Sequence, residues 1–174
     1  MINSVKGIKS NNSDFKFAKT KEGARLPVKR LEDAGYDIFP CFDEEYIKIE
    51  PHKTAIIPTG IASACTPDWS FLITERSSLG TKGIACRCGV IDSGYRGEWS
   101  IVLTNTTDFP FIIVKRGFEF ITGESGTIKY PYEKALAQFL IIPVPKVSIE
   151  EISYDELKEI SSERGTGRFG STGN

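Results

Sequence analysis

Short runs of β-branched and aromatic residues, separated by residues typical of turns, recur along most of the chain. Residues 46–50 alternate apolar and polar side chains, as a half-buried strand does. Similar runs, bounded by Gly, Pro or Asn, occupy residues 54–57, 71–74, 99–103, 111–114 and 135–144. Because these short runs recur with turn residues between them, the pattern predicts an all-β sandwich or jelly roll rather than alternating strands and helices.

One helix is predicted after the strands, over residues 153–160. It begins with Ser153 and carries Glu156 three residues later, which is the pattern of a capping box. The residues beyond it, 161–174, contain four glycines and hardly any apolar side chain, a composition typical of a flexible segment. We therefore expect one folded domain over residues 1–160 and a flexible C-terminal arm over residues 161–174.

The charge balance limits the partners that the chain can bind. Lys and Arg number 22 against 23 Asp and Glu, so the formal net charge is -1. This balance gives no general field for holding DNA, although a local cluster of Arg, Ser and backbone N–H groups can still bind a small anion. No apolar stretch approaches the roughly 20 residues that span a bilayer, and residues 1–14 are polar, without the apolar core of a signal peptide. We expect a cytoplasmic protein that binds neither nucleic acid nor membrane.

The four cysteines match no zinc-binding spacing. Cys86 and Cys88 are separated by one residue and would share one face of a strand, but the only histidine, His52, is far away in the sequence. Buried reduced thiols are a more common outcome than a zinc site for such cysteines.

A segment with an acid at a tight turn lies between Cys88 and Trp99. A strand ends at Ile91, the chain turns through Asp92-Ser-Gly94, and a strand resumes near Glu98. Asp92 is either an ordinary turn residue that bonds its own backbone or a general base beside a hairpin whose open backbone groups recognise a flat polar ligand. The residues alone favour the turn.

Two further segments carry groups suited to phosphate. Glu75-Arg-Ser-Ser-Leu-Gly80 supplies a cation, hydroxyls and approachable N–H groups, although Ser-Ser can simply start a helical turn. Residues 164–173 combine two arginines, two consecutive hydroxyls and Phe169. This stretch is either a disordered tail or a segment that orders over a ligand. Asp37 and Gln138 are also candidate site residues. Asp37 can equally be an ordinary acid in a turn, and Gln138 can be a hydrogen-bonded amide in the core.

Taken together, five segments resemble, in order, the five motifs of the trimeric dUTPase family: AGYD, RSSLG, GVIDSGYRGEW, ALAQ and RGTGRFGSTG. The resemblance covers about residues 22 to 174. It implies a distorted jelly roll and a homotrimer with a swapped C-terminal segment, whose three active sites lie between subunits. The implied reaction is hydrolysis of dUTP to dUMP and pyrophosphate by water attack on the α-phosphorus, which keeps uracil out of DNA and supplies dUMP for dTMP synthesis.

The resemblance also implies residue roles. Asp92 would activate the attacking water, and Arg164 from the arm would assist catalysis. The substrate would be bound by Arg76, Ser77, Ser78, Gly89, Ile91, Tyr95, Gln138, Arg168, Phe169, Gly170, Ser171 and Thr172. The implied cofactor is Mg2+, held mainly by the substrate phosphates and reached through water by Asp37.

The sequence departs from the family pattern before ALAQ, where an inserted segment of about residues 118–133 contains two β-like runs around Gly-Glu-Ser-Gly. This composition predicts a hairpin. Similar insertions occur in some phage members, which points to a phage enzyme working in the host cytoplasm. The segment is either a plain loop insertion or a docking surface for another protein that uses Phe118, Phe120, Tyr130 and Tyr132.

Two other functions compete with this one. A dCTP deaminase shares the fold and needs an acid such as Glu98 near the hairpin, but the hairpin tip and the glycine-rich arm match the dUTPase form. A regulatory module that uses nucleotide only as a switch would not need the full set of catalytic residues. Direct nucleic-acid binding is disfavoured by the near-neutral charge.

Overall fold

The computed structural model describes residues 15–118 and 125–166 of the 174-residue chain. The chain divides into two compact units, Met1–Val144 and Pro145–Asn174. The first unit ends before the C-terminal helix, whereas the sequence places this helix in the folded domain. The expected domain limit at residue 160 stays a prediction.

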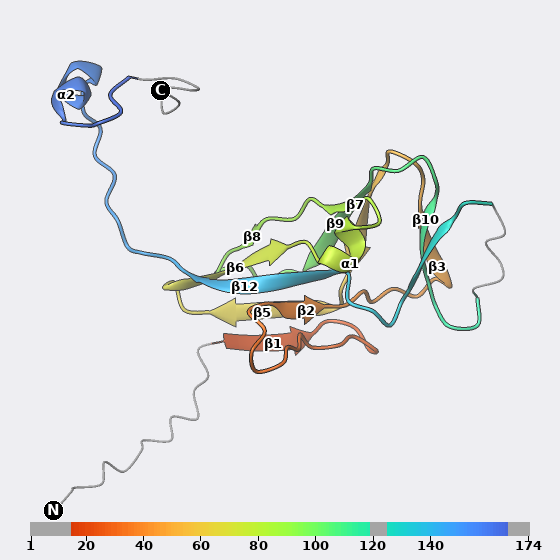
Figure 1. The fold of residues 1–174 in the computed structure, drawn as a ribbon. Helices are drawn as coiled ribbons and strands as arrows, with labels where there is room; N and C mark the ends of the chain where they lie inside the picture. The colour runs from red at the N-terminus through yellow and green to blue at the C-terminus, as the bar shows by residue number, and fades with distance from the viewer. Residues whose placement is uncertain (1–14, 119–124, 167–174) are drawn as a thin grey trace, which may run out of the picture. The chain divides into compact units, whose positions relative to one another are not determined.

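The described part of the first unit is built from small sheets around one core (Figure 1). The largest sheet has the order β2 (Tyr36–Ile38), β12 (Ala137–Pro143), β6 (Trp69–Thr74) and β8 (Val90–Ile91). A second has the order β4 (Thr54–Pro58), β9 (Ser100–Asn105) and β7 (Ile84–Cys86), and β1 (Phe15–Lys19) pairs with β5 (Ile61–Cys65). The remaining sheet has the order β11 (Ile128–Pro131), β10 (Phe111–Val114) and β3 (Tyr46–Ile49). This is the all-β, distorted jelly roll that the sequence predicts.

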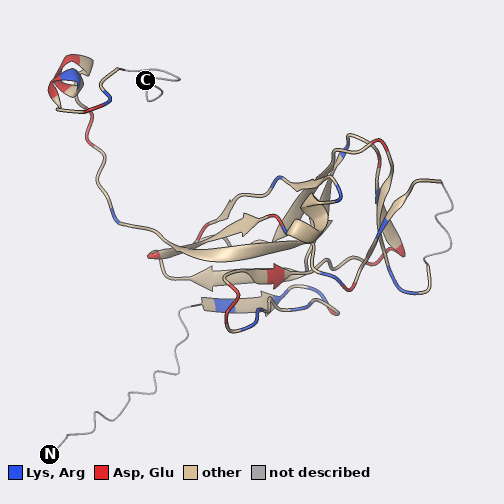
Figure 2. Ribbon diagram, in the orientation of Figure 1, with Lys and Arg blue, Asp and Glu red and all other residues tan. Residues whose placement is uncertain are grey.

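Aromatic rings fill the centre of the first unit. Phe71, Trp99 and Phe139 are at most 1% exposed, and their ring centroids lie 5.0 to 5.3 Å apart. The Trp99 indole N–H donates to the Ser63 hydroxyl at 3.1 Å, so the one polar atom of this ring is satisfied. Charged residues lie mainly in the loops, and the strands are largely uncharged (Figure 2). Phe71 pairs with Ile91, and Trp99 ends the segment from Cys88 to Trp99, so the core anchors that hairpin.

The inserted segment is integrated into the fold more deeply than the sequence suggests. Its second half forms β11, which pairs with β10 in parallel. Tyr130 is 2% exposed, and Tyr132 packs edge-on against Phe42 with ring centroids 4.9 Å apart. The docking-surface alternative is therefore wrong for Tyr130, which is buried. Tyr130 faces inward because alternate residues of β11 point to the same side, and Tyr132, just beyond the strand, is half-buried. Phe120 and much of the first β-like run lie outside the described residues.

The second unit contains the predicted helix, α2 (Tyr154–Glu159). The capping box is confirmed, since Ser153 Oγ accepts from the Glu156 N–H at 3.1 Å and Glu156 Oε2 accepts from the Ser153 N–H at 2.8 Å. These hydrogen bonds lower the pKa of the Glu156 carboxyl. Every described residue of α2 is solvent-exposed. Across the described ranges, no helix has the length and apolar character needed to cross a membrane.

Candidate active site

A cavity of about 670 Å³ opens beside the largest sheet. Three residues that the sequence assigns to substrate or metal, Asp37, Arg76 and Gln138, line it together. The sheet register explains this, because Gln138 on the central strand β12 lies opposite Asp37 on β2 and Thr74 on β6. Arg76 follows two residues after Thr74. The cavity is completed by Val28, Lys29, Arg30, Asp33, Ala34, Gly35, Thr74 and Leu140.

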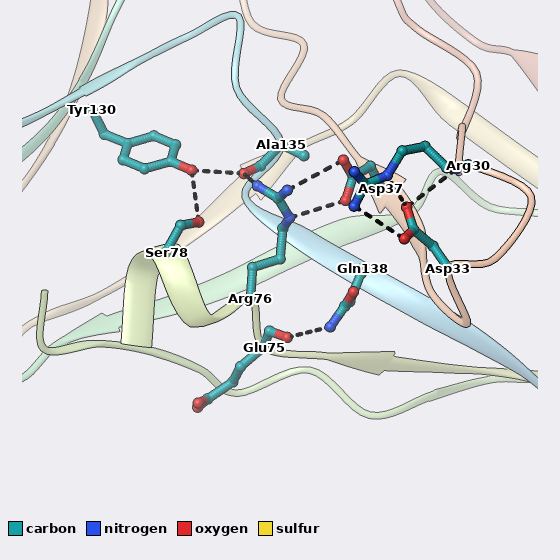
Figure 3. A network of polar contacts seen from close by, with 9 residues as sticks. All are labelled: Arg30, Asp33, Asp37, Glu75, Arg76, Ser78, Tyr130, Ala135 and Gln138. Atoms are coloured by element: carbon teal, nitrogen blue, oxygen red, sulfur yellow. Dashed lines mark hydrogen bonds and ion pairs between the residues drawn. The ribbon is translucent and has the colours of Figure 1, made fainter. Parts of the chain in front are cut away.

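Arg76 and Asp37 form a two-point ion pair in this cavity (Figure 3). Arg76 Nε lies 2.9 Å from Asp37 Oδ1, and Nη2 donates to Oδ2 at 3.3 Å. The third guanidinium nitrogen, Nη1, donates to the Ala135 carbonyl at 3.0 Å. The two side chains are only 27% and 32% exposed, so the pair is partly shielded from water. This arrangement fixes the plane of the guanidinium, as recognition of a phosphate requires.

Gln138 is hydrogen-bonded, as expected for an amide in an apolar strand. Its Nε2 donates to the Glu75 carbonyl at 2.9 Å and thereby holds the end of β6 next to Arg76. The Gly35 backbone lies very close to this side chain. A Cβ at position 35 would be 2.4 Å from Gln138 Oε1. A larger residue at position 35 would therefore displace the Gln138 amide from its present position.

A second ion pair at the rim of the cavity was not anticipated from the sequence. Arg30 Nε and Nη2 donate to the two Asp33 carboxylate oxygens at 2.9 and 3.1 Å. These contacts lower the pKa of Asp33 and raise that of Arg30. The Arg30 side chain is 88% exposed, so the pair contributes little to stability. Its sequence signal is a basic pair followed within three residues by two acids, Lys-Arg-Leu-Glu-Asp33.

Ser77 and Ser78 begin a short helical turn, α1 (Ser77–Gly80), directly after Arg76. The plain alternative raised by the sequence, a helical turn following a strand, is therefore correct for the backbone. Ser78 Oγ lies 3.2 Å from the Tyr130 hydroxyl oxygen, which in turn donates to the Ala135 carbonyl at 3.0 Å. The inserted segment thus reaches Ser78, a connection that sequence patterns do not reveal.

The hairpin forms a separate, smaller cavity of about 300 Å³. It is lined by Val90, Ile91, Asp92, Tyr95, Glu98 and Ser100. The turn is closed by the backbone, with the Tyr95 N–H donating to the Asp92 carbonyl at 3.1 Å. Asp92 is exposed, and within the described part of the chain its carboxylate has no hydrogen-bond or ion-pair partner. The turn therefore does not use this carboxylate, which leaves it available for chemistry.

Backbone groups beside this cavity are also open. β8 is an edge strand of its sheet in the described structure, so its outer N–H and C=O groups face away from β6. Gly89, just before it, uses its carbonyl to accept from the Ile73 N–H at 3.0 Å, which fixes the start of the hairpin. Tyr95 is held by a hydrogen bond from its hydroxyl to the Glu98 carbonyl at 3.1 Å.

Glu98 has a structural task. Its Oε1 accepts from the Gly60 N–H at 3.0 Å and its Oε2 accepts from the Thr20 hydroxyl at 2.9 Å. Both carboxylate oxygens are thus engaged in joining the hairpin to neighbouring segments. This arrangement disfavours the deaminase alternative, which needs Glu98 as a mobile acid and base.

The two cavities lie toward opposite ends of β6. Ile91 pairs with Phe71 in antiparallel register, so the chain continues from Ile91 to Asp92 away from Thr74 and Arg76. The five residue steps from Phe71 to Arg76 correspond to about 16 Å of extended chain. One chain therefore does not bring the Asp92 carboxylate to the Arg76 guanidinium.

The C-terminal arm contributes least to the visible site. Arg164 is described and belongs to the second unit. The remaining predicted arm residues, Arg168, Phe169, Gly170, Ser171 and Thr172, lie outside the described residues.

The described side chains could hold a metal ion only if the substrate supplied most of its ligands. Over residues 15–118 and 125–166, no three His, Cys, Asp or Glu side chains come together as a possible metal site. Asp37 offers a single partly exposed carboxylate that is already paired with Arg76. This set suits Mg2+, which keeps several waters and binds readily to phosphate oxygens.

Cys86 and Cys88 are two free thiols just before the hairpin. The hydrogen bond between them lowers the pKa of Cys86 to about 7, whereas that bond and burial raise the pKa of Cys88. We therefore expect Cys86 to be the cysteine that iodoacetamide alkylates fastest, with the rate rising through a midpoint near pH 7 because the thiolate is the nucleophile. Peptide mass spectrometry across pH measures this. Alkylation of Cys86 with a midpoint near pH 9, the ordinary value for a thiol, would contradict it.

The fold and its two separate cavities define an all-β protein whose candidate site residues lie in two different parts of the subunit. Comparisons with known proteins specify the family. The family model for dUTPase matches residues 21–118. A protein of Clostridium acetobutylicum named deoxyuridine 5'-triphosphate nucleotidohydrolase is 36% identical over 167 residues, which cover 92% of this chain and 97% of that protein. The chain therefore belongs to the dUTPase family.

Solved structures of phage proteins resemble it in fold. The dUTPase of Staphylococcus bacteriophage 80alpha with dUpNHpp has a TM-score of 0.71 at 27% identity, covering 95% of this chain and 100% of that one. That enzyme is described as controlling transfer of virulence genes by a G protein-like mechanism. A mutant dUTPase from phage phi11 of S. aureus, described with a structural Mg(II) ion, has a TM-score of 0.64 at 27% identity, covering 83% of this chain and 99% of that one. The phage-type resemblance is thereby supported.

Proposed function

We propose that the chain is a magnesium-dependent dUTP diphosphatase that hydrolyses dUTP to dUMP and pyrophosphate. The observation that carries the proposal is the Asp92 carboxylate, exposed in the hairpin cavity and without a partner in the described chain. A carboxylate in this state can accept a proton from water. The names of the relatives give the substrate, and the Arg76 cavity supplies groups suited to its phosphates.

The active form in this proposal is a homotrimer. Asp92 and Arg76 lie toward opposite ends of β6, so a working site takes the hairpin from one subunit and the Arg76 cavity from another. The second unit, Pro145–Asn174, would swap between subunits and deliver Arg164 and the arm residues. The exposure of every described residue of α2 within one chain supports this role.

Each half of the site has a distinct task. The open backbone groups of the edge strand β8 pair with the uracil edge, and Tyr95 packs against the sugar. Polar groups arranged for uracil are left unpaired by cytosine, which is a strong basis for rejection. Arg76, Ser77, Ser78 and Gln138 bind phosphate oxygens, and Arg164 stabilises charge on the leaving pyrophosphate. Mg2+ would be held mainly by the substrate phosphates and reached through water by Asp37, and it would supply positive charge that neutralises the phosphates.

The first experiment measures pyrophosphate release from dUTP, dTTP, dCTP and UTP in the presence of magnesium. Rapid release from dUTP alone supports the proposal. Absence of release from all four nucleotides would contradict it and favour a regulatory module. Ammonia release from dCTP would instead identify a deaminase. The free cysteines suit a reducing compartment, and we place the activity in the cytoplasm.

We also propose that the inserted segment contacts a partner protein, which the virulence-gene role described for the phage 80alpha enzyme favours. Because Tyr130 is buried and Tyr132 packs against Phe42, the contact surface is restricted to about residues 118–127. Replacing residues 119–124 with a Gly-Ser linker keeps β11 in place, so dUTP hydrolysis should remain within about twofold of wild type, as surface-loop changes are well tolerated. Binding of the partner protein should be lost, and unchanged binding in this variant would contradict the assignment.

A further inference from the structure

Cys86 and Cys88 lie on either side of the exposed Arg87, at the end of β7 and just before the hairpin. Their side chains hydrogen-bond to each other, both are half-buried against the core, and both are free thiols. Neither residue lines the Arg76 cavity or the hairpin cavity. The structure therefore holds two thiols in contact that have no task in the proposed hydrolysis.

The surroundings of the two sulfurs divide the chemistry between them. Cys88 has one proton, and a Cys86 thiolate is the strongest acceptor for it, which lowers the pKa of Cys86 to about 7. The carbonyls of Ser100 and Val102, at 3.7 and 3.9 Å from Cys88 Sγ, are weaker acceptors for the same proton. Cys88 Sγ also accepts the Val102 N–H at 2.9 Å, which holds it in place. Cys86 is thus the nucleophile of the pair, with a second thiol beside it.

The other two cysteines of the chain are in different surroundings. Cys41 is only 2% exposed. Cys65 donates to the Trp69 carbonyl at 3.4 Å, and burial raises the pKa of its thiol. Because the thiolate is the reactive form, an oxidant should react with Cys86 before either of these residues.

The backbone allows the two sulfurs to bond. A disulfide needs its two α-carbons roughly 4.4 to 6.8 Å apart, and two residue steps of extended chain correspond to about 6.6 Å. The regular strand ends at Cys86, and the Val102 N–H beyond it is taken by the Cys88 sulfur. Cys88 thus lies outside the strand, where the chain can shorten enough for a disulfide to form.

We propose that Cys86 and Cys88 form a redox-active dithiol site that reacts with peroxides and closes to a disulfide. The Cys86 thiolate attacks one peroxide oxygen, the O–O bond breaks, and the leaving hydroxide or alkoxide takes a proton from solvent. Cys86 is then a sulfenic acid. The Cys88 sulfur attacks the Cys86 sulfur, and the Cys88 proton leaves with the sulfenic hydroxyl as water. The two thiols lose two electrons, which the peroxide gains. The inference does not depend on the proposed function.

The test is limited oxidation of the reduced full-length protein by hydrogen peroxide at pH 7, followed by alkylation and peptide mass spectrometry. Trypsin cleaves after Arg87, so a disulfide between Cys86 and Cys88 keeps residues 83–87 joined to residues 88–96 until dithiothreitol is added. We expect this linked pair to be the main product. It should form about fivefold or more faster than Cys65 is oxidised, because the larger thiolate fraction of Cys86 outweighs its lower nucleophilicity.

Three variants assign the roles. In Cys88→Ser, oxidation should stop at a Cys86 sulfenic acid that dimedone traps, whereas Cys86→Ser should react no faster than Cys65 does. Cys65→Ser is the matched control and should form the disulfide between Cys86 and Cys88 at the wild-type rate. Absence of the linked peptides, a disulfide between two chains, or an equal rate in protein unfolded by urea would overturn the proposal.

Discussion

Replacing Asp92 with Asn is expected to lower kcat for dUTP hydrolysis by roughly 10²- to 10⁴-fold, the contribution of a positioned general base. Asn has almost the shape of Asp but cannot accept a proton from water at neutral pH. Because the Asp92 carboxylate is exposed and has no partner within the described chain, the substitution should leave the fold unchanged. Pyrophosphate release under saturating dUTP measures the effect.

A binding measurement and a control variant are needed to interpret this result. The Kd for dUpNHpp should stay within a few-fold of wild type, which locates the loss in the chemical step. Asp108→Asn is the matched control, because this exposed acid pairs with His52 at 2.9 Å away from either cavity. It should retain full activity. An Asp92→Asn enzyme with near-normal kcat would show that another group activates the water.

The second large effect is expected at Arg76. In Arg76→Lys the charge remains, but a single ammonium cannot reproduce the fixed fork that contacts Asp37 and Ala135 together. We expect kcat/KM for dUTP to fall by roughly 10- to 100-fold, the loss of one or two charge-assisted hydrogen bonds. Steady-state kinetics measures kcat and KM separately. The fall in kcat/KM should come mainly from a rise in KM, because these groups also bind the substrate in its ground state.

Arg25→Lys is the matched control for Arg76→Lys. Arg25 is also partly buried and donates to carbonyls, those of Tyr132 and Glu133, and its guanidinium lies 3.7 Å from the Phe39 ring centroid. It does not line either cavity. This variant should lower the melting temperature while leaving KM unchanged. A similar rise in KM in both variants would mean that Arg76 acts through general stability.

Local patterns predicted the strands that carry strong β-formers. Residues 46–50 and 111–114 appear as β3 and β10 because alternation and β-branched side chains act over a few neighbours. β5, with the sequence Ile-Ala-Ser-Ala-Cys65, was missed because its small residues have weak strand preference. The parallel pairing of β11 with β10 was also missed, since it depends on contacts distant in the sequence.

The same contrast between local patterns and contacts distant in the sequence applies to the candidate site. Asp37, Arg76 and Gln138 were identified as candidates from their segments, but the Asp37–Arg76 ion pair follows from the register of β2, β12 and β6. The burial of Tyr130 was not predicted, because an aromatic in an insertion carries no sign of which way it points. Its burial depends on packing against Phe111. Sequence patterns could not reveal that Asp92 and Arg76 lie toward opposite ends of β6.

The length of β6 also has a genetic consequence. Under the proposed trimer, a chain that lacks Asp92 still offers an intact Arg76 cavity, and a chain that lacks Arg76 still offers an intact hairpin. Two defective alleles expressed in one cell can then complement each other, because random mixing would unite both intact halves in about a quarter of the sites. For the same reason, an inactive chain in excess would impair sites that contain normal chains.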